Sequence, residues 1–145
     1  MLQDVLIRDW MTAEVISVKA DTPIAEAHQV MKKNNIRRLV VTDEAKKPVG
    51  IVTIGDVREA SPSDATSLSI WELNYLWAQI HVDEVMTKSL LTVKPDEPVI
   101  AAARIMLENK VGGVPVVNAA GEVAGIITES DVFRMLVKSA EEPTP

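Results

Sequence analysis

The chain has 145 residues, 47% of them hydrophobic and 25% charged, and it carries a formal net charge of −6 at pH 7. This acidic balance disfavours a general nucleic-acid binder, which usually has a basic surface. There is no cysteine, which excludes disulfide frameworks, thiolate metal sites and cysteine nucleophiles and fits a reducing compartment. No signal-peptide pattern and no apolar run of roughly 20 residues is present, so a cytoplasmic protein without membrane partners is expected.

The first half alternates β-rich runs with apolar residues at helical spacing. Thr22-Pro23 opens a helix, with Thr expected as the cap and Pro at the first helical position. The expected elements, in order, are a strand at 15–18, a helix from 22 to 35, strands at 36–42 and 49–53, and a short helix around Val57.

A linker over residues 61–81 follows. Its first part, 61–67, is rich in small polar residues and proline. Ser69, with Glu72 three positions later, predicts a capping box at the start of a helix that reaches about Ile80. The apolar residues of this helix cover more than one face and include two of the three tryptophans. It is therefore expected either to cover the repeat interface within the chain or to contact another subunit.

The second half repeats the first without a gap at an offset of about 75 residues. Met11-Thr12 corresponds to Met86-Thr87, and the phrase 50–56 corresponds to 125–131. The pattern predicts an α+β fold of two similar units, at 5–60 and 82–138, related by a pseudo-two-fold axis. The second unit is expected to contain a strand at 90–93, a helix at 99–108, strands at 112–117 and 123–128, and a helix at 132–137.

The phrase Gly125-Ile126-Ile127-Thr128-Glu129-Ser130-Asp131 runs from a buried strand into the first turn of a helix. A capping box explains one such Thr-x-x-Asp by itself. Three features favour a ligand site as well: the phrase occurs twice, its glycine permits close backbone approach, and a helix start attracts an anionic group. A carboxylate there is suited to accept hydrogen bonds from ribose hydroxyls, and capping and ligand binding are compatible.

The order of these motifs, a Met-Thr pair, a short strand, a Pro-headed helix, paired strands and Gly-hydrophobic-hydrophobic-Thr-x-x-Asp, resembles a tandem pair of CBS (cystathionine-β-synthase) domains, the Bateman module. The linker at 60–63 with the helix residues 72–76 is also similar to the stand-alone CBS proteins of the acetoin-utilisation B type. The resemblance implies two β-α-β-β-α repeats that bind adenine nucleotides or adenosyl compounds in clefts between them. It also implies homodimers that pair through their helices.

By this resemblance, Asp131 and Asp56 would hold ribose hydroxyls, and Thr128 and Thr53 would contact ribose or phosphate. The segments after each Met-Thr pair and the strand entrances would line the adenine. The complete set of expected nucleotide-binding residues comprises Lys88, Ser89, Leu90, Gly113, Val114, Pro115, Thr128, Ser130, Asp131, Thr12, Ala13, Glu14, Val15, Arg38, Leu39, Thr53 and Asp56.

The two expected sites are not equivalent. Asp131 faces a Gly-Gly-Val-Pro strand entrance, the more regular nucleoside pocket, whereas Arg37-Arg38 at the other entrance either neutralises phosphates or crowds the cleft. Arg134 and Lys138 on the last helix are equally consistent with phosphate binding and with a solvated face. His28 and His81 lack obvious carboxylate or cysteine companions at metal spacing, so packed or solvated histidines and no metal site are expected.

The sequence thus predicts a non-catalytic, energy-sensing regulatory module whose ligand is AMP, ADP, ATP or S-adenosylmethionine, with no required cofactor and a target protein still to be identified. No nucleophile–base pair, metal pattern or P-loop supports an enzyme. The alternative is a protein–protein interaction and dimerisation scaffold with degenerate nucleotide pockets, suggested by the aromatic helix and the altered first repeat.

Overall fold

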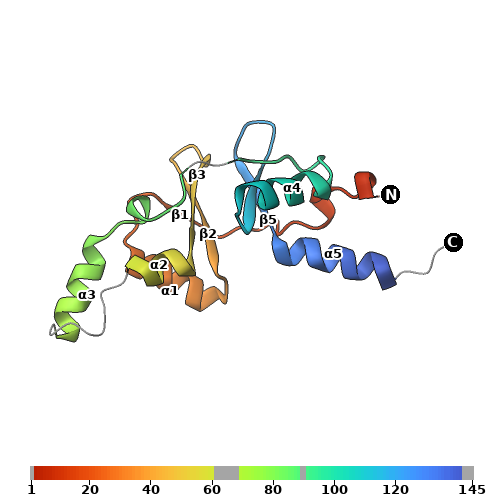
Figure 1. The fold of residues 1–145 in the computed structure, drawn as a ribbon. Coiled ribbons are helices and arrows are strands. Elements are labelled where there is room, and N and C mark those ends of the chain that lie inside the picture. Colours follow the sequence, from red (N-terminus) through yellow and green to blue (C-terminus); the bar gives the residue numbers. More distant parts are fainter. Residues whose placement is uncertain (1, 61–68, 89–90, 142–145) are drawn as a thin grey trace. The chain divides into compact units, whose positions relative to one another are not determined.

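The computed structural model describes residues 2–60, 69–88 and 91–141, which divide into two compact units (Figure 1). We name them after the aspartates they contain. The Asp56 unit is Ile16–Leu90, and the Asp131 unit combines Met1–Val15 with Leu91–Pro145. The polar first part of the predicted linker, 61–67, lies outside the described residues, as do Ser89 and Leu90.

The Asp56 unit contains a three-stranded sheet in the order β1 (Ser17–Lys19), β2 (Arg38–Thr42) and β3 (Pro48–Thr53). β1 pairs with β2 in parallel, and β2 pairs with β3 antiparallel. Helices α1 (Ile24–Asn34) and α2 (Ile54–Ala60) pack on the sheet and on each other, and α3 (Ile70–Gln79) packs against α1. The alternating pattern of the sequence is therefore confirmed here, with the core formed where the apolar faces of helices and strands meet.

The Asp131 unit repeats this plan with α4 (Val99–Asn109), β4 (Gly113–Val117), β5 (Val123–Thr128) and α5 (Glu129–Glu141). The predicted strand at 90–93 is wrong as a strand. Among its described residues, only Val93 pairs, through a single parallel bridge to Val116. This bridge is the counterpart of the pair between Val18 and Val41. No helix among the described residues combines the length and apolar character needed to cross a membrane.

The two strand pairs share their register and their irregularities. Arg38 pairs with Thr53 as Gly113 pairs with Thr128, and the register shifts once near the far end of each pair. The turns beyond these shifts are built alike. Asp43 Oδ1 accepts hydrogen bonds from the backbone N–H groups of Ala45 and Lys47, and Asn118 at the matching turn accepts from Ala120 and Glu122.

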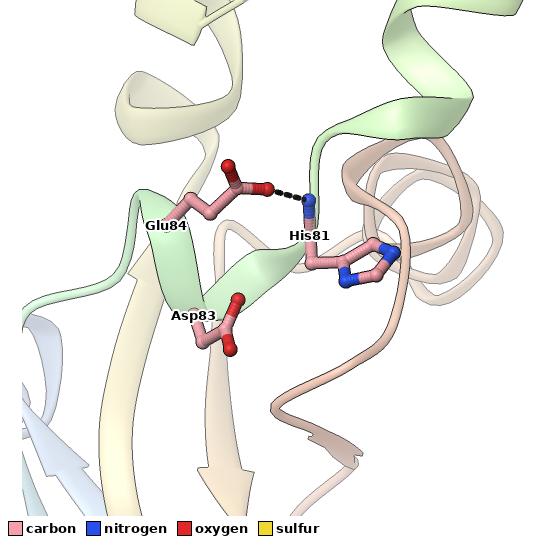
Figure 2. Close-up of side chains that lie close together, drawn as sticks. All are labelled: His81, Asp83 and Glu84. Carbon is pink, nitrogen blue, oxygen red and sulfur yellow. Dashed lines mark hydrogen bonds between the residues drawn. The ribbon is translucent and has the colours of Figure 1, made fainter.

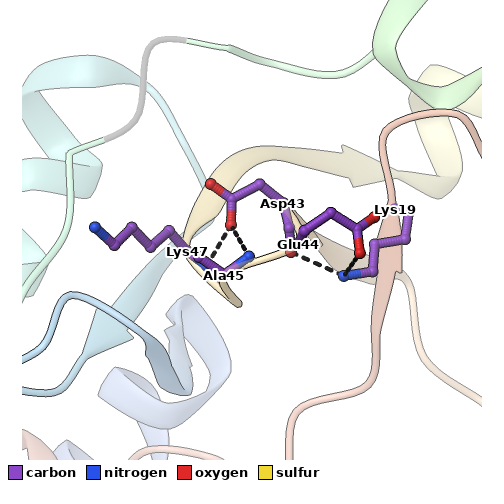
Figure 3. A network of polar contacts seen from close by, with 5 residues as sticks. All are labelled: Lys19, Asp43, Glu44, Ala45 and Lys47. Carbon is purple, nitrogen blue, oxygen red and sulfur yellow. Dashed lines mark hydrogen bonds and ion pairs between the residues drawn. The ribbon is translucent and has the colours of Figure 1, made fainter.

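Lys19 anchors the Asp43 turn to β1, as Figure 3 shows. Its ammonium group donates to the carbonyl oxygen of Asp43 at 2.8 Å and lies 4.0 Å from the Glu44 carboxylate. The Glu44 side chain is almost fully exposed, so the backbone hydrogen bond is the main anchor and the ion pair adds little.

Each repeat is preceded by a segment that we call its lead-in: the first contains Met11-Thr12 and the second contains Met86-Thr87. Each lead-in packs on the other repeat and not on the repeat that follows it. Ile7 donates its N–H to the carbonyl oxygen of Glu97, and Thr12 pairs with Ile126, so the first lead-in packs on the second repeat. Reciprocally, Val82 donates its N–H to Thr22, and Thr87 pairs with Ile51. The domain boundaries predicted from the sequence place each lead-in together with the repeat that follows it. These boundaries remain a prediction.

This exchange changes how the two Pro-headed helices begin. The expectation that Thr22 caps the first helix is wrong, because Pro23 is the N-cap, and it makes no side-chain capping bond. Instead the first helical N–H, of Ile24, donates to the carbonyl oxygen of Ile80 at 2.9 Å. Val99 donates to Val5 in the same way at 2.8 Å. Lead-in backbone thus satisfies donors that a side-chain cap would otherwise serve.

The helix in the linker begins as the sequence predicts. The Ser69 hydroxyl accepts a hydrogen bond from the N–H of Glu72, and the Glu72 carboxylate accepts from the same hydroxyl. Ser69 is therefore confirmed as the N-cap, although the Glu72 carboxylate bonds to the Ser69 hydroxyl where a full capping box would use the Ser69 N–H. α3 ends within one residue of the predicted position.

Candidate functional site

The strand-to-helix corner of the Asp131 unit is where β5 ends at Thr128 and α5 begins at Glu129. Thr128 is paired with Gly113 of β4, and the N–H of Glu129 donates to the carbonyl oxygen of Gly112 at 3.1 Å. One side of the corner is therefore formed by the backbone of Gly112 and Gly113, at the entrance of β4, where no side chains project. A ligand can approach the backbone closely at such positions.

The Asp131 carboxylate is fixed at this corner. Oδ2 accepts hydrogen bonds from the N–H of Thr128 at 2.9 Å and from its hydroxyl at 3.2 Å. Oδ1 accepts from the guanidinium of Arg134 at 2.8 Å. Only 6% of the aspartate side chain is exposed. The part of the expected capping box in which Asp131 reaches back to the backbone of Thr128 is thus confirmed, and the carboxylate is held in one orientation.

The first lead-in closes the other edge of β5. Thr12 and Ile126 exchange two backbone hydrogen bonds, of 2.9 and 3.0 Å. This contact depends on Gly125, because a Cβ there would lie 2.6 Å from the carbonyl oxygen of Thr12 and 2.9 Å from the sulfur of Met11. The glycine of the motif is therefore explained by the docking of the lead-in.

One group of the predicted binding residues lies in the Asp131 unit. Its described members are Thr12, Ala13, Glu14, Val15, Gly113, Val114, Pro115, Thr128, Ser130 and Asp131. Ala13, Glu14 and Ser130 are exposed, whereas Val114 and Pro115 are buried. The side chain of Val114 is part of the hydrophobic core, so it supports the corner from behind.

The second group lies in the Asp56 unit and consists of Arg38, Leu39, Thr53, Asp56 and Lys88. The N–H of Thr53 donates to Asp56 Oδ2 at 2.8 Å, and the N–H of Asp56 donates to the Thr53 hydroxyl at 3.1 Å. Leu39 is fully buried in the core, and Lys88 is exposed next to the paired Thr87. Ser89 and Leu90 lie outside the described residues.

The ion pair of Asp131 with Arg134 has no equivalent among the described residues of the Asp56 unit. The position that matches Arg134 in the repeat is Glu59, which is exposed on α2. The sequence left open whether Arg134 binds phosphate or lies on a solvated face, without connecting it to Asp131. Opposite charges three residues apart on a helix are the signal that predicts this contact.

The histidines have different surroundings. His28 is packed, as expected, with its ring centroid 5.3 Å from that of Trp77. The expectation that His81 lacks carboxylate companions is wrong, because the side-chain ligand atoms of His81, Asp83 and Glu84 lie within 4.8 Å of one another. Figure 2 shows that the Glu84 carboxylate accepts a hydrogen bond from the backbone N–H of His81, at 2.6 Å. This bond belongs to the start of the short helix η3 (Val82–Glu84), so a structural role explains the cluster.

An apolar groove of about 570 Å³ lies between α4 and α5 in the Asp131 unit. Its walls include Met106, Leu107, Val132 and Phe133, and Leu107 and Phe133 are largely exposed. Asp131 and Thr128 do not line it. The groove therefore follows the helical face and reaches the strand-to-helix corner at Gly112 and Glu129, which also line it.

Two segments of the chain, residues 7–63 and 82–138, match the family model of the CBS domain. The chain belongs to the CBS domain family. The two matches fall on the repeats that carry Asp56 and Asp131, so both strand-to-helix corners are parts of CBS repeats. The α+β fold of two CBS repeats predicted from the sequence is confirmed.

Solved structures of CBS pairs are similar over nearly the whole chain. The CBS domain pair of protein MJ0100, in complex with 5′-methylthioadenosine and S-adenosyl-L-methionine, is 30% identical with a TM-score of 0.77, covering 93% of this chain and 98% of that one. CBSX2 in complex with AMP is 28% identical with a TM-score of 0.74, covering 94% and 99%. A putative acetoin utilization protein (AcuB) from Vibrio cholerae is 28% identical with a TM-score of 0.75, covering 97% and 98%.

The curated relatives differ in length. A CBS domain-containing protein from Dictyostelium discoideum is 29% identical, with 97% of each chain covered. The L-aspartate semialdehyde sulfurtransferase of Methanocaldococcus jannaschii is 31% identical over 90% of this chain, but the match spans only 23% of that relative. The similarity to the sulfurtransferase thus concerns less than a quarter of that protein.

Proposed function

We propose that this CBS pair is a regulatory module that binds adenosine-type ligands and has no catalytic activity of its own. The observation that carries the proposal is the Asp131 corner, where an almost fully buried carboxylate is fixed at the start of a helix. Similar CBS pairs in complex with AMP and with 5′-methylthioadenosine and S-adenosyl-L-methionine support it.

The chemistry of the corner fits an adenosine moiety. A fixed carboxylate accepts hydrogen bonds from a ribose diol, and the positive end of the α5 dipole favours an anionic substituent. In this proposal Thr128 and Ser130 contact ribose or phosphate, and residues 12–15 with the entrance of β4 line the base. The matching residues of the Asp56 unit form the second, less regular site, where Arg38 and Lys88 supply positive charge.

As a sensor, the protein acts by changing its shape or its affinity for a target protein when the ligand binds. A ligand changes such an equilibrium only through a difference in affinity for the two states. We further propose a cytoplasmic location and a homodimer, in line with the absence of cysteine and with the exposed apolar faces of the helices.

A thermal-shift panel tests the ligand class. AMP, ADP, ATP and S-adenosylmethionine are compared with GMP, which keeps the ribose and phosphate but changes the base. A ligand that binds the native state alone stabilises it by roughly 2.7 kcal/mol at a hundredfold excess over Kd. We expect at least one adenosine compound to raise Tm well above the effect of GMP. If none of the adenosine compounds raises Tm, the proposed ligand class is wrong.

The second candidate function is an interaction scaffold, and α3 is the observation that favours it. Trp71 and Tyr75 are 81% and 66% exposed, and Ile70 and Leu76 extend the same apolar surface. Aromatic side chains are enriched at the cores of protein interfaces. A dimer or target protein that covers this helix is compatible with ligand binding at Asp131.

A further inference from the structure

The ion pair between Asp131 and Arg134 creates a competition at the proposed ribose site. A carboxylate has about four lone-pair positions for hydrogen bonds. Three are used, two by the N–H and hydroxyl of Thr128 and one by the Arg134 guanidinium. One acceptor position is therefore free, whereas a ribose that presents two hydroxyls requires two. Strand pairing fixes the N–H of Thr128, so the second position is released either by the Thr128 hydroxyl, which can rotate, or by Arg134, the charged donor of the three.

The exposure of the Arg134 side chain allows it to change position. Its side chain is 63% exposed, whereas that of Asp131 is 6% exposed, so the guanidinium reaches the carboxylate from solvent. It also borders a shallow surface groove together with Ser130 and Lys138. An exposed arginine that leaves one carboxylate needs another anion to recover its charge-assisted hydrogen bond. A phosphate on the same ligand supplies that anion, whereas a neutral nucleoside does not.

Among the described residues of the other repeat, Asp56 has no such arginine partner. Glu59 takes the place of Arg134, and Oδ2 of Asp56 accepts a single hydrogen bond, from the N–H of Thr53, among the residues that the structure describes. The two repeats thus carry the same aspartate with neighbouring charges of opposite sign. An anionic ligand is favoured beside Asp131 and disfavoured beside Glu59 by this one substitution.

We infer that Arg134 is a specificity residue that makes the Asp131 site select adenosine ligands with an anionic 5′ substituent. In the free protein its guanidinium occupies Asp131. When a nucleotide binds, the ribose takes over the carboxylate, and the guanidinium transfers to the phosphate. A neutral adenosine compound breaks the same ion pair without replacing it. The inference rests on the proposed function, because it needs a ribose on Asp131.

The test compares AMP with 5′-methylthioadenosine, which share adenosine but differ in charge at the 5′ position. Isothermal titration calorimetry measures both Kd values for the wild-type chain and for Arg134→Ala. We expect the variant to bind AMP more weakly and 5′-methylthioadenosine equally or more tightly, so that the ratio of the two Kd values changes about tenfold. Lys138→Ala is the matched control, because it removes one positive charge from the same groove and, among the described residues, Lys138 forms no ion pair or hydrogen bond with Asp131.

Each outcome decides the inference. A changed ratio for Arg134→Ala with an unchanged ratio for Lys138→Ala supports it. Equal changes for both ligands, or the same ratio change in both variants, overturn it while leaving adenosine binding intact. Binding of neither ligand to the wild-type chain overturns the proposed function and this inference together. Arg134→Gln, which keeps the helix propensity, replaces Arg134→Ala if that variant does not fold.

Discussion

Thr12 lies against Gly125 so closely that a Cβ on the glycine would stand 2.6 Å from the threonine carbonyl oxygen. The same lead-in residue exchanges two hydrogen bonds with Ile126. The N-terminal segment is thereby attached to the repeat that carries Asp131, more than a hundred residues later in the sequence.

Gly125→Ala is expected to push the lead-in away from β5. Overpacking of a well-packed contact costs about 1–3 kcal/mol. Thermal and urea unfolding followed by circular dichroism measure this loss. Gly55→Ala is the matched control, because a Cβ there meets only the Thr53 hydroxyl, at 3.5 Å, and alanine favours the helix. If Gly125→Ala is as stable as Gly55→Ala, the close approach of Thr12 is not important for stability.

Ile7→Ala and Val82→Ala test the exchange of the lead-ins. Both side chains are fully buried, Ile7 in the core of the Asp131 unit and Val82 in the core of the Asp56 unit. Removing methyl groups from a core costs roughly 2–5 kcal/mol for Ile→Ala and less for the smaller valine. Native-state hydrogen exchange should show Ile7→Ala lowering protection in β4 and β5 first, and Val82→Ala lowering it in β2 and β3 first. The reverse pattern would mean that each lead-in packs on its own repeat.

The two tryptophans of α3 should separate packing from association. Trp77 contacts His28 and the core of the Asp56 unit, whereas Trp71 is mostly exposed. Trp77→Ser is therefore expected to lower Tm. Trp71→Ser should leave the Tm of a dilute sample nearly unchanged but reduce the mass measured by light scattering if α3 is an interface. An unchanged mass for Trp71→Ser would remove the main support for the scaffold function.

The periodicity of the sequence was sufficient to predict most of the local elements, but not the region 90–93, where only Val93 pairs among the described residues. Thr-x-x-Asp predicted both strand-to-helix corners, and Ser69 with Glu72 predicted the start of α3, because such caps involve only neighbouring residues. The exchange of lead-ins could not be predicted, since a repeat offset is the same whichever copy a segment packs on. That exchange also explains the wrong cap at Thr22, as backbone from Ile80 replaces the side chain.

Within the candidate site, the sequence predicted one local contact but not its environment, and the binding role of the residues stays a prediction. Asp131 and Thr128 are close together because three positions along a helix start bring them together. The competition with Arg134 follows from side-chain geometry, and the sequence alone left two interpretations of that arginine open. The core positions of Val114 and Leu39 follow from the face that each strand buries, which the residue pattern of a fully buried strand does not reveal.

The most direct test of the central proposal is calorimetric titration of AMP into the wild-type chain, Asp131→Ala and Asp56→Ala. The two variants remove the same group from matching corners, so they share the cost of a lost helix cap. We predict saturable binding to the wild-type chain that is lost or at least about tenfold weaker in Asp131→Ala and largely retained in Asp56→Ala. AMP binding that is unaffected by Asp131→Ala, in a variant that circular dichroism shows to be folded, would contradict the assignment of Asp131 as the ribose ligand.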